Sequence, residues 1–289
     1  MSDADIKRQV REFYDQVGWQ VVSEGQYQNA RYEDLRPVSR EYIHRCHLRV
    51  GQYLKPEGNY LLDAGSGPIQ YPEYLTYSEG YRYRVCADIS IVALQEARKR
   101  LGAKALCVVA DVANLPFRPE AFDGVVSLHT LHHLPPEDHR KAYFELERML
   151  APGSTAVVVN GWTQSALMTA VDPLVRLAEW LQALRHPTSR QAVPAREPGR
   201  LEQKQPNGTY TLKFDADWLK GALDGQMTYE IRSWRTVHVR FLRALIHSWL
   251  GGHAWLCILY RLEERFPRFM GEKGQYPLIV IRKSGPAQH

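Results

Sequence analysis

The sequence predicts an α/β protein organised around a doubly wound, mostly parallel sheet of seven strands. From residue 60 to residue 160, short apolar runs alternate with segments of helical periodicity, which is the order that parallel strands with helical crossovers require. Three of the runs also end in an aspartate, at Asp63, Asp88 and Asp111. Such strand ends meet along one edge of a parallel sheet, where ligands bind.

The N-terminal residues 1–55 are predicted to form two helices, over residues 3–18 and 37–54. Apolar side chains recur at helical spacing in the first helix, and Gly18 ends it. A polar and aromatic segment, 25–36, separates the two helices.

Residues 56–162 are predicted to hold the first five strands of the sheet. The strands fall at 60–62, 83–88, 106–110, 125–128 and 157–159, and the helices between them at 69–79, 91–101 and 137–150. This segment is therefore expected to form the core of the protein.

Residues 163–226 are expected to form a helical and loop cap inserted into the core. The first helix, over 165–185, has one apolar face made of Leu167, Val171, Leu174, Ala178 and Leu181. A loop rich in proline and arginine follows over 186–205. Alternation predicts a short strand over 210–214, and Asp215 is a good N-cap for a further helix.

Residues 227–289 should supply the two closing strands, 229–234 and 277–282, with a hydrophobic helical hairpin inserted at about 237–270. Residues 244–260 carry no Lys, Arg, Asp or Glu, but this stretch is shorter than the roughly 20 apolar residues of a membrane span. One interpretation is a cap over the substrate site. The other is a hydrophobic surface, flanked by arginines, for a lipid-linked substrate, a membrane surface or a partner.

The stretch from Leu61 to Pro68 carries the strongest functional signal. An apolar run turns there through an acid and two glycines, and a backbone without Cβ atoms lets a ligand approach closely. Asp88 follows about 20 positions after Gly67, where a nucleotide-binding fold places its ribose-binding acid.

In this order and spacing, the motifs resemble those of class I S-adenosylmethionine (SAM)-dependent methyltransferases, in particular the type 11-like, small-molecule branch. The resemblance rests on Asp63-x-Gly65-x-Gly67, Asp88, Asp111-Val112, Leu115-Pro116-Phe117, the runs 121–127 and 131–134, and the turn 150–154. It covers roughly residues 55–161 and implies a Rossmann-like core with residues 1–55 as a lid. A helical pair that only packs on the sheet is the alternative for those residues.

The resemblance also implies SAM as cofactor, S-adenosyl-L-homocysteine (SAH) as product, and no metal. The implied cofactor site consists of Asp63, Gly65, Ser66, Gly67, Asp88, Ile89, Asp111, Val112 and Leu128. Asp88 would accept hydrogen bonds from the ribose hydroxyls, and Asp111 with Val112 would lie beside the adenine. The pattern departs at Ile69, where a third glycine is common, and Gln70 disfavours a nicotinamide-dependent oxidoreductase.

A hydroxyl acceptor must lose its proton, and a histidine poised near neutral pH suits that role. His129 and His132 follow the fourth predicted strand, so both are candidate bases, with His129 ranked first. His133, His238 and Tyr210 are further candidates. Asn-Pro-Pro-Tyr, the signature of base and amide methylation, is absent after this strand.

Composition limits the class of protein and its partners only broadly. The chain has 289 residues, of which 44% are hydrophobic and 24% charged, as in ordinary globular proteins. A net charge of +5 suits an acidic substrate or an anionic surface but is too modest to indicate nucleic acid. Four widely spaced cysteines form no zinc-binding pair or disulfide framework. The N-terminus lacks an apolar signal core, so a cytoplasmic location is expected.

Together these features predict O-methylation of a bulky, partly apolar small molecule, such as a polyketide, a sugar-containing metabolite or a lipid-linked glycan. C-methylation of a quinone precursor is one alternative. A non-catalytic SAM-binding or scaffold subunit is another, and any turnover would exclude it. The sequence does not identify the acceptor or the oligomeric state.

Overall fold

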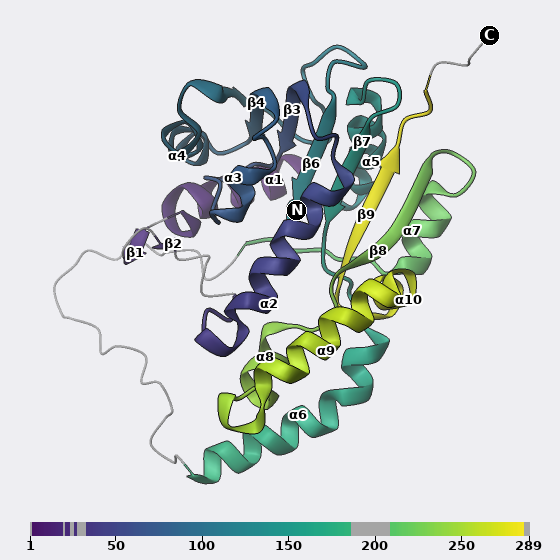
Figure 1. The fold of residues 1–289 in the computed structure, drawn as a ribbon. Coiled ribbons are helices and arrows are strands. Elements are labelled where there is room, and N and C mark those ends of the chain that lie inside the picture. Colours follow the sequence, from purple (N-terminus) through teal and green to yellow (C-terminus); the bar gives the residue numbers. More distant parts are fainter. Residues whose placement is uncertain (1, 20, 24–25, 28–32, 186–208, 286–289) are drawn as a thin grey trace, which may run out of the picture.

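A computed structural model describes the chain apart from residues 1, 20, 24–25, 28–32, 186–208 and 286–289 (Figure 1). A seven-stranded sheet with the spatial order β5-β4-β3-β6-β7-β9-β8 forms its centre. The strands are β3 (Gly58–Ala64), β4 (Tyr81–Asp88), β5 (Ala105–Val109), β6 (Gly124–Leu128), β7 (Thr155–Val159), β8 (Thr228–Arg235) and β9 (Tyr276–Arg282). Neighbours pair in parallel except at β9, which is antiparallel to β7 and β8. The predicted fold class is confirmed.

The strand order reverses between β3 and β6, and this reversal locates the site. From β3 the chain adds β4 and then β5 on one side, and then returns to place β6 on the other side of β3. Asp63 lies opposite Val126 of β6 and Cys86 of β4. In open α/β sheets a crevice forms at the carboxyl ends of the strands where the order reverses.

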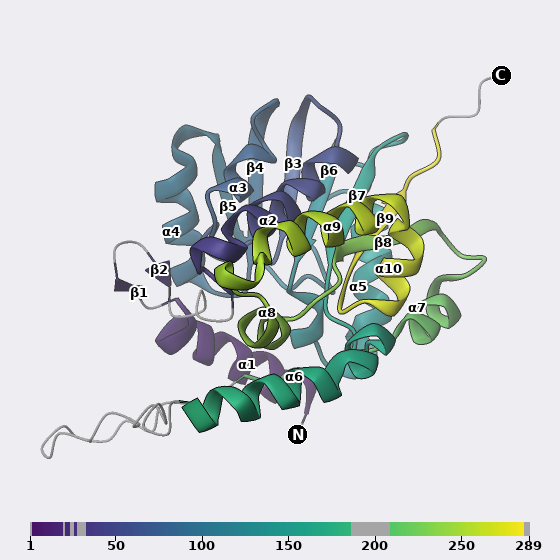
Figure 2. The ribbon, with the colours of Figure 1, turned by 60° about the horizontal axis from the view of Figure 1, so that its bottom comes forward.

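Helices cover both faces of the sheet (Figures 1 and 2). The α-helices are α1 (Asp3–Phe13), α2 (Pro37–Leu48), α3 (Glu73–Thr76), α4 (Ile91–Leu101), α5 (Pro136–Met149), α6 (Ala166–Arg185), α7 (Ala216–Leu223), α8 (Val239–Leu245), α9 (Gly252–Arg265) and α10 (Pro267–Lys273). Leu62 and Val125 pack with α5 and α7 in one core cluster. Their neighbours Leu61 and Val126 pack with α2, α4 and α9 in another, as the alternation of side chains along a strand requires.

The strands and the helices 91–101 and 137–150 lie close to their predicted positions, but the predicted helix 69–79 is much shorter. Only α3 forms there, because the chain first passes through a loop with positive φ at Gly65, Gly67 and Ile69. Pro72 then directly precedes the short helix. The loop, rather than a helix, therefore follows β3.

The two predicted N-terminal helices also change form near their ends. Helix α1 continues as a π-helical turn, η1 (Tyr14–Gly18), and α2 continues as a 3₁₀ turn, η3 (Arg49–Tyr53). Between them lies a small hairpin of β1 (Val21–Ser23) and β2 (Gln26–Tyr27). Short 3₁₀ turns, η4 (Gly102–Lys104) and η5 (Leu131–His133), follow α4 and β6.

The predicted strand 210–214 does not form. Two backbone hydrogen bonds tie the segment to the core, from Leu212 N to His132 O at 2.8 Å and from Thr163 N to Phe214 O at 3.0 Å, but they form no strand ladder. Asp215 does cap the next helix, because its carboxylate accepts from Trp218 N at the start of α7.

The predicted buried face of α6 is right only in part. Leu167 and Val171 pack against the core. Leu174 and Leu181 are exposed, whereas Met168 and Val175 are buried. The rotation of the helix follows from its packing on α8, where Arg240 forms ion pairs with both Asp172 (2.8 Å) and Glu179 (2.7 Å). These acids lie seven residues apart, two turns along one side of the helix, and so turn the 168 and 175 positions toward α8.

The predicted hydrophobic hairpin consists of α8, the 3₁₀ turn η6 (Ser248–Leu250), α9 and α10, which are called the cap below. That it covers a substrate site remains a prediction. Helix α8 packs on α6 and α9 packs on α2, at one end of the molecule (Figure 2). Trp249 and Trp255 remain 72% and 60% exposed. Within the described residues, no helix is both long and apolar enough to cross a membrane.

Candidate active site

A cavity of about 500 Å³ lies at the carboxyl edge of the sheet, where the strand order reverses. The predicted cofactor residues and the two first base candidates all line it, namely Asp63, Gly65, Ser66, Gly67, Asp88, Ile89, Asp111, Val112, Leu128, His129 and His132. The volume of the cavity and the arrangement of these residues suit a ligand of nucleoside size. Which atom each residue contacts remains a prediction.

The glycine loop accepts only glycine at its first turn. Gly65 has φ +75°, and a Cβ atom there would lie 2.1 Å from Cγ2 of Thr130. Thr130 donates to the Gly65 carbonyl at 3.1 Å and so fixes the loop against the end of β6. A bare backbone at this point leaves space for a ligand to lie against the loop.

Asp88 joins two elements at the cavity wall. One carboxylate oxygen accepts from Gly67 N at 2.9 Å, and the other accepts from Ser90 N at 2.8 Å. Burial raises the pKa of Asp88 to about 6. Each oxygen keeps a second lone pair, so the carboxylate still fits the two hydroxyls of a ribose.

Asp63 lines the cavity but is bound mainly to protein. Arg84 donates to one of its carboxylate oxygens from two nitrogens, at 2.5 and 3.0 Å, and both side chains are buried. Arg84 also donates to the Tyr74 carbonyl at 2.5 Å. Asp63 therefore holds β3 and β4 together in this structure, and its place in the cofactor site remains a prediction.

Helix α1 lines the cavity beside Asp111. Its contact there is made by Lys7, a residue that the sequence reasoning missed. Lys7 lies 2.5 Å from a carboxylate oxygen of Asp111 and 2.5 Å from one of Asp138. Val10 and Phe13 line the same wall. A lysine at the border of an amphipathic helix was the available signal, but its partners lie more than 100 residues away. That residues 1–55 act as a lid remains a prediction.

His129 occupies a strained position at the end of β6. It has φ +55°, and its backbone N–H donates to the Val159 carbonyl at 2.7 Å. Its ring packs edge-on against Trp234 and Tyr276, with centroids 4.9 and 6.0 Å apart. Burial, followed by the charge of Arg235, lowers the pKa of His129 to about 3.

The neighbouring histidines are also neutral at physiological pH. Nδ1 of His132 lies 3.3 Å from the Asn160 side-chain oxygen, and burial lowers its pKa well below the usual value. His133 lies between the Tyr14 hydroxyl (2.7 Å) and the Tyr210 carbonyl (2.8 Å), and burial lowers its pKa to about 4. Burial thus moves the pKa of each of these histidines away from neutrality, and the catalytic role of His129 or His132 remains a prediction.

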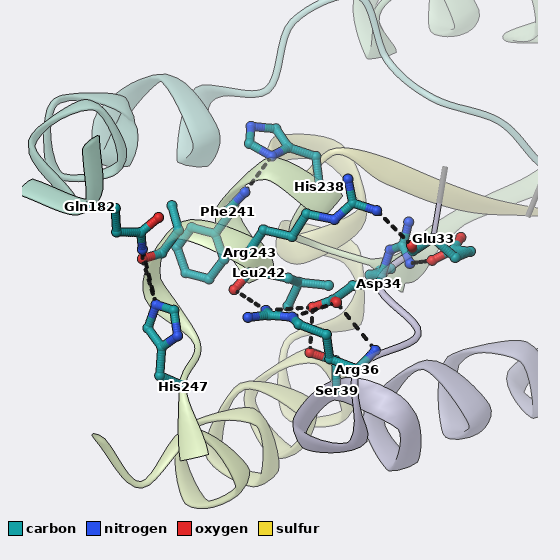
Figure 3. A network of polar contacts seen from close by, with 12 residues as sticks. Glu33, Asp34, Arg36, Ser39, Gln182, His238, Phe241, Leu242, Arg243 and His247 are labelled. Atoms are coloured by element: carbon teal, nitrogen blue, oxygen red, sulfur yellow. Dashed lines mark hydrogen bonds and ion pairs between the residues drawn. The ribbon is translucent and has the colours of Figure 1, made fainter. Parts of the chain in front are cut away.

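The other two base candidates do not line the cavity. Nδ1 of His238 accepts from Phe241 N at 2.9 Å and caps α8 (Figure 3). Tyr210 contributes its backbone carbonyl, bonded to His133, whereas its side chain is not part of the wall.

The far end of the cavity consists of residues that the sequence reasoning did not select. Arg235, at the end of β8, is buried, forms an ion pair with Glu33 and lies over the ring of Tyr276 at 4.7 Å. Lys213 is half-buried at the same end. Arg235 could have been noticed as a charged residue that ends a buried strand, because β8 ends at the same edge as β6 and β7.

Residues 33–39 are fixed by the cap, which positions Glu33 (Figure 3). Arg36 forms an ion pair with Asp34 at 2.7 Å and donates to the Leu242 carbonyl of α8 at 2.8 Å. Arg243 of α8 donates to the Glu33 backbone carbonyl at 3.1 Å. The N-terminal segment and the cap thus meet at the far end of the cavity.

Comparison with known proteins finds similarity to methyltransferases. Residues 62–158 match the family model of a methyltransferase domain. A probable tRNA methyltransferase 9B from Bos taurus is 26% identical over 62% of this chain and 38% of its own length. A tRNA (carboxymethyluridine(34)-5-O)-methyltransferase from Arabidopsis thaliana is 30% identical over 50% of this chain and 40% of its own length.

A malonyl-[acyl-carrier protein] O-methyltransferase from Legionella pneumophila is 34% identical over 35% of this chain and 36% of its own length. The chain thus spans about two fifths or less of each of these relatives. Among solved structures, phosphoethanolamine N-methyltransferase 1 from Haemonchus contortus superposes with a TM-score of 0.59 at 10% identity, over all of this chain and 51% of the other. At that identity the likeness shows the fold alone.

The fold, the cavity and the matched family model define the class. The chain carries a class I SAM-dependent methyltransferase domain, as its motifs predict. The cofactor of this domain is SAM, and the glycine loop and Asp88 fit it: the loop leaves no room for a side chain at Gly65, and Asp88 offers paired acceptors.

Proposed function

We propose that this chain transfers a methyl group from SAM to an oxygen atom of a small-molecule acceptor. The observation that carries the proposal is the extent of the cavity. Beyond the glycine loop and Asp88 it continues past His129 to a second polar end at Lys213 and Arg235. A ligand site with a separate polar end suits a cofactor and an acceptor side by side.

In this proposal the chain supplies position and a dry site. SAM provides the activated methyl group, and its transfer to a nucleophile is an in-line displacement, which depends mainly on alignment and exclusion of water. Val10, Phe13 and Tyr14 cover the cavity from the N-terminal side. Tyr71 and Tyr74 add aromatic wall, which suits a bulky, partly apolar acceptor such as a polyketide, a sugar-containing or a lipid-linked compound.

Oxygen is favoured over carbon by the similar proteins whose names specify the acceptor atom. Both the malonyl-[acyl-carrier protein] enzyme and the carboxymethyluridine enzyme are named as O-methyltransferases. The test is transfer of labelled methyl from SAM to a panel of purified acids, alcohols and phenols, with the product identified by mass spectrometry and NMR. Methylation at carbon would refute the proposal.

A second candidate is a modified nucleoside in tRNA. It is favoured by the similarity to tRNA methyltransferases and by the net charge of +5, which suits a polyanion. The test is incorporation of labelled methyl into total tRNA, followed by nuclease digestion. Label in a nucleoside would support this candidate, and label only in small molecules extracted from cells would exclude it.

A further inference from the structure

Three hydrogen-bond donors on residues that line the cavity have no partner within the described part of the chain. The ammonium group of Lys213 forms no ion pair or hydrogen bond there. Nε of Arg235 and Oγ1 of Thr209 are fully buried and likewise make no hydrogen bond with a described residue. Buried polar groups normally have partners, and those that line a binding cavity point to a ligand.

Lys213 is held in place by its backbone. Leu212 N donates to His132 O at 2.8 Å, and the Thr163 hydroxyl donates to the Lys213 carbonyl at 2.5 Å. The ammonium group lies close to Gly161, since a Cβ atom built there would be 3.2 Å from Nζ. The charges of Lys213 and Arg235 both lower the pKa of His129, so both lie near its ring.

The charges around the cavity do not balance at this end. Glu33 compensates Arg235, Arg84 compensates Asp63, and Lys7 lies between two aspartates. The three histidines are neutral, because burial lowers the pKa of each. Lys213 is left as an uncompensated cation in a partly desolvated place, where one negative charge would be stabilised.

We infer that the acceptor is a carboxylic acid, that its carboxylate binds the ammonium group of Lys213, and that one carboxylate oxygen receives the methyl group. This inference rests on the proposed O-methyl transfer and names its substrate class. A carboxylate carries the single charge that Lys213 lacks, whereas a phosphate monoester would bring nearly two. It also offers one oxygen to the donors and a second oxygen to the methyl carbon.

The reaction balances without a base. The carboxylate oxygen forms the new O–C bond as the C–S bond breaks, the electron pair stays on sulfur, and the products are a methyl ester and a neutral thioether. No proton is released, which agrees with the absence of a histidine poised near neutrality. The carboxylate loses its charge during transfer, so Lys213 binds the ground state more strongly than the transition state, and its loss should raise KM without lowering kcat.

The first test measures binding without turnover. SAH-saturated protein is titrated by calorimetry with phenylacetate and with 2-phenylethanol, which share an aromatic ring suited to the cavity wall. We expect the acid to bind at least tenfold more tightly than the alcohol. Lys213→Met should abolish the difference, Lys213→Arg should retain most of it, and the exposed Lys99→Met should leave it unchanged. Equal binding of acid and alcohol would overturn the inference.

The second test identifies the product. Labelled methyl from SAM is offered to matched acids and alcohols, and the products are treated with alkali, which releases methanol from esters but not from ethers. We expect alkali-labile label from acids, with KM raised about 10- to 100-fold in Lys213→Met and kcat not lowered. Alkali-stable ether label with no preference for acids would overturn the inference while leaving O-methyl transfer intact. Tight acid binding without any transfer would support the anion site and refute the proposed function.

Discussion

Asp88 shows how a single side chain can organise a site before any ligand arrives. Its two oxygens hold the backbone of Gly67 and of Ser90, which belong to the glycine loop and the start of α4. The same carboxylate faces the cavity. Loss of Asp88 should therefore affect both the shape of the loop and the binding of the ribose.

We expect Asp88→Ala to weaken SAM binding by about 2 to 3 kcal/mol, because charge-assisted hydrogen bonds to the ribose are lost. Isothermal titration calorimetry measures the change, and circular dichroism checks that the variant folds. Unchanged affinity, or binding of NADH in place of SAM by the wild type, would contradict the assignment.

The raised pKa of Asp88 predicts a pH-dependent affinity. Burial raises this pKa to about 6, so the carboxyl group is ionised above pH 6 and protonated below it. Only the ionised form accepts from both ribose hydroxyls. SAM affinity should therefore fall roughly tenfold between pH 7.5 and pH 5, since one pKa unit below the midpoint leaves about a tenth of the groups ionised. Asp88→Asn should bind weakly at both pH values, and a pH-independent wild type would count against this explanation.

For His129, in contrast to Asp88, we expect no pH dependence near neutrality. Its pKa of about 3 means that the imidazole is already neutral at pH 6, and a base that weak contributes little to proton removal. We expect kcat to show no histidine limb between pH 6 and 9, and His129→Ala to lower kcat by less than tenfold. His132→Ala serves as the comparison. A loss of 10²- to 10⁴-fold in His129→Ala alone would restore its role as general base.

At the scale of elements, a buried ion pair joins the cap to the sheet. Glu263 of α9 accepts from the Tyr42 hydroxyl of α2 (2.7 Å), from Arg49 (2.8 Å) and from Thr236 N after β8 (2.8 Å). The neighbouring Glu264 also pairs with Arg49 at 2.7 Å but is 46% exposed. The two acids therefore offer a matched pair of variants.

We expect Glu263→Ala to lower the free energy of unfolding by about 3 to 5 kcal/mol, because it leaves Arg49 buried without its main partner. Glu264→Ala should cost less than about 1 kcal/mol, since its carboxylate is largely solvated. Urea unfolding followed by fluorescence measures both. Equal effects of the two substitutions would show that the buried network does not hold the cap.

The sequence predicted elements well where local signals agreed. The apolar runs located all seven strands of the sheet, and Ser90 and Asp215 cap α4 and α7 through their side chains. Prediction failed where a distant partner decided the outcome. The loop around Ile69 replaces a helix because it encloses the cavity, and α6 is turned by Arg240 from a separate helix.

At the scale of the whole molecule, the cofactor half of the site could be predicted from local signals and the far half could not. The cofactor half lies on consecutive strands, so its residues could be selected from order and spacing alone. The far half combines Glu33, Lys213, Arg235 and Tyr276, which meet only after the N-terminal segment, the cap and the last two strands have folded together. No local pattern marks such a set, and the acceptor class was therefore beyond sequence reasoning.

The cap leaves an apolar surface at one end of the molecule. Along α9, Trp255, Ile258 and Leu262 share one face at helical spacing and are 60%, 46% and 40% exposed. Phe266 and Phe269 continue the exposed apolar surface toward α10. Arg261, Arg265 and Arg268 are exposed in the same stretch. Apolar side chains flanked by cations suit an anionic membrane surface, which would bring a lipid-linked acceptor close to the cavity.

We therefore expect the protein to co-sediment with vesicles that contain anionic lipid, and to do so less in high salt, because the arginines contribute through screened charges. Trp255→Glu should lower the partition coefficient roughly tenfold, since it removes an inserted aromatic ring and adds a repelled charge. Leu106→Glu, at an exposed apolar position on the edge strand β5, is the control and should bind as the wild type does. If neither anionic nor zwitterionic vesicles bind the wild type, or if both variants lose binding equally, the exposed face of α9 does not contact lipid.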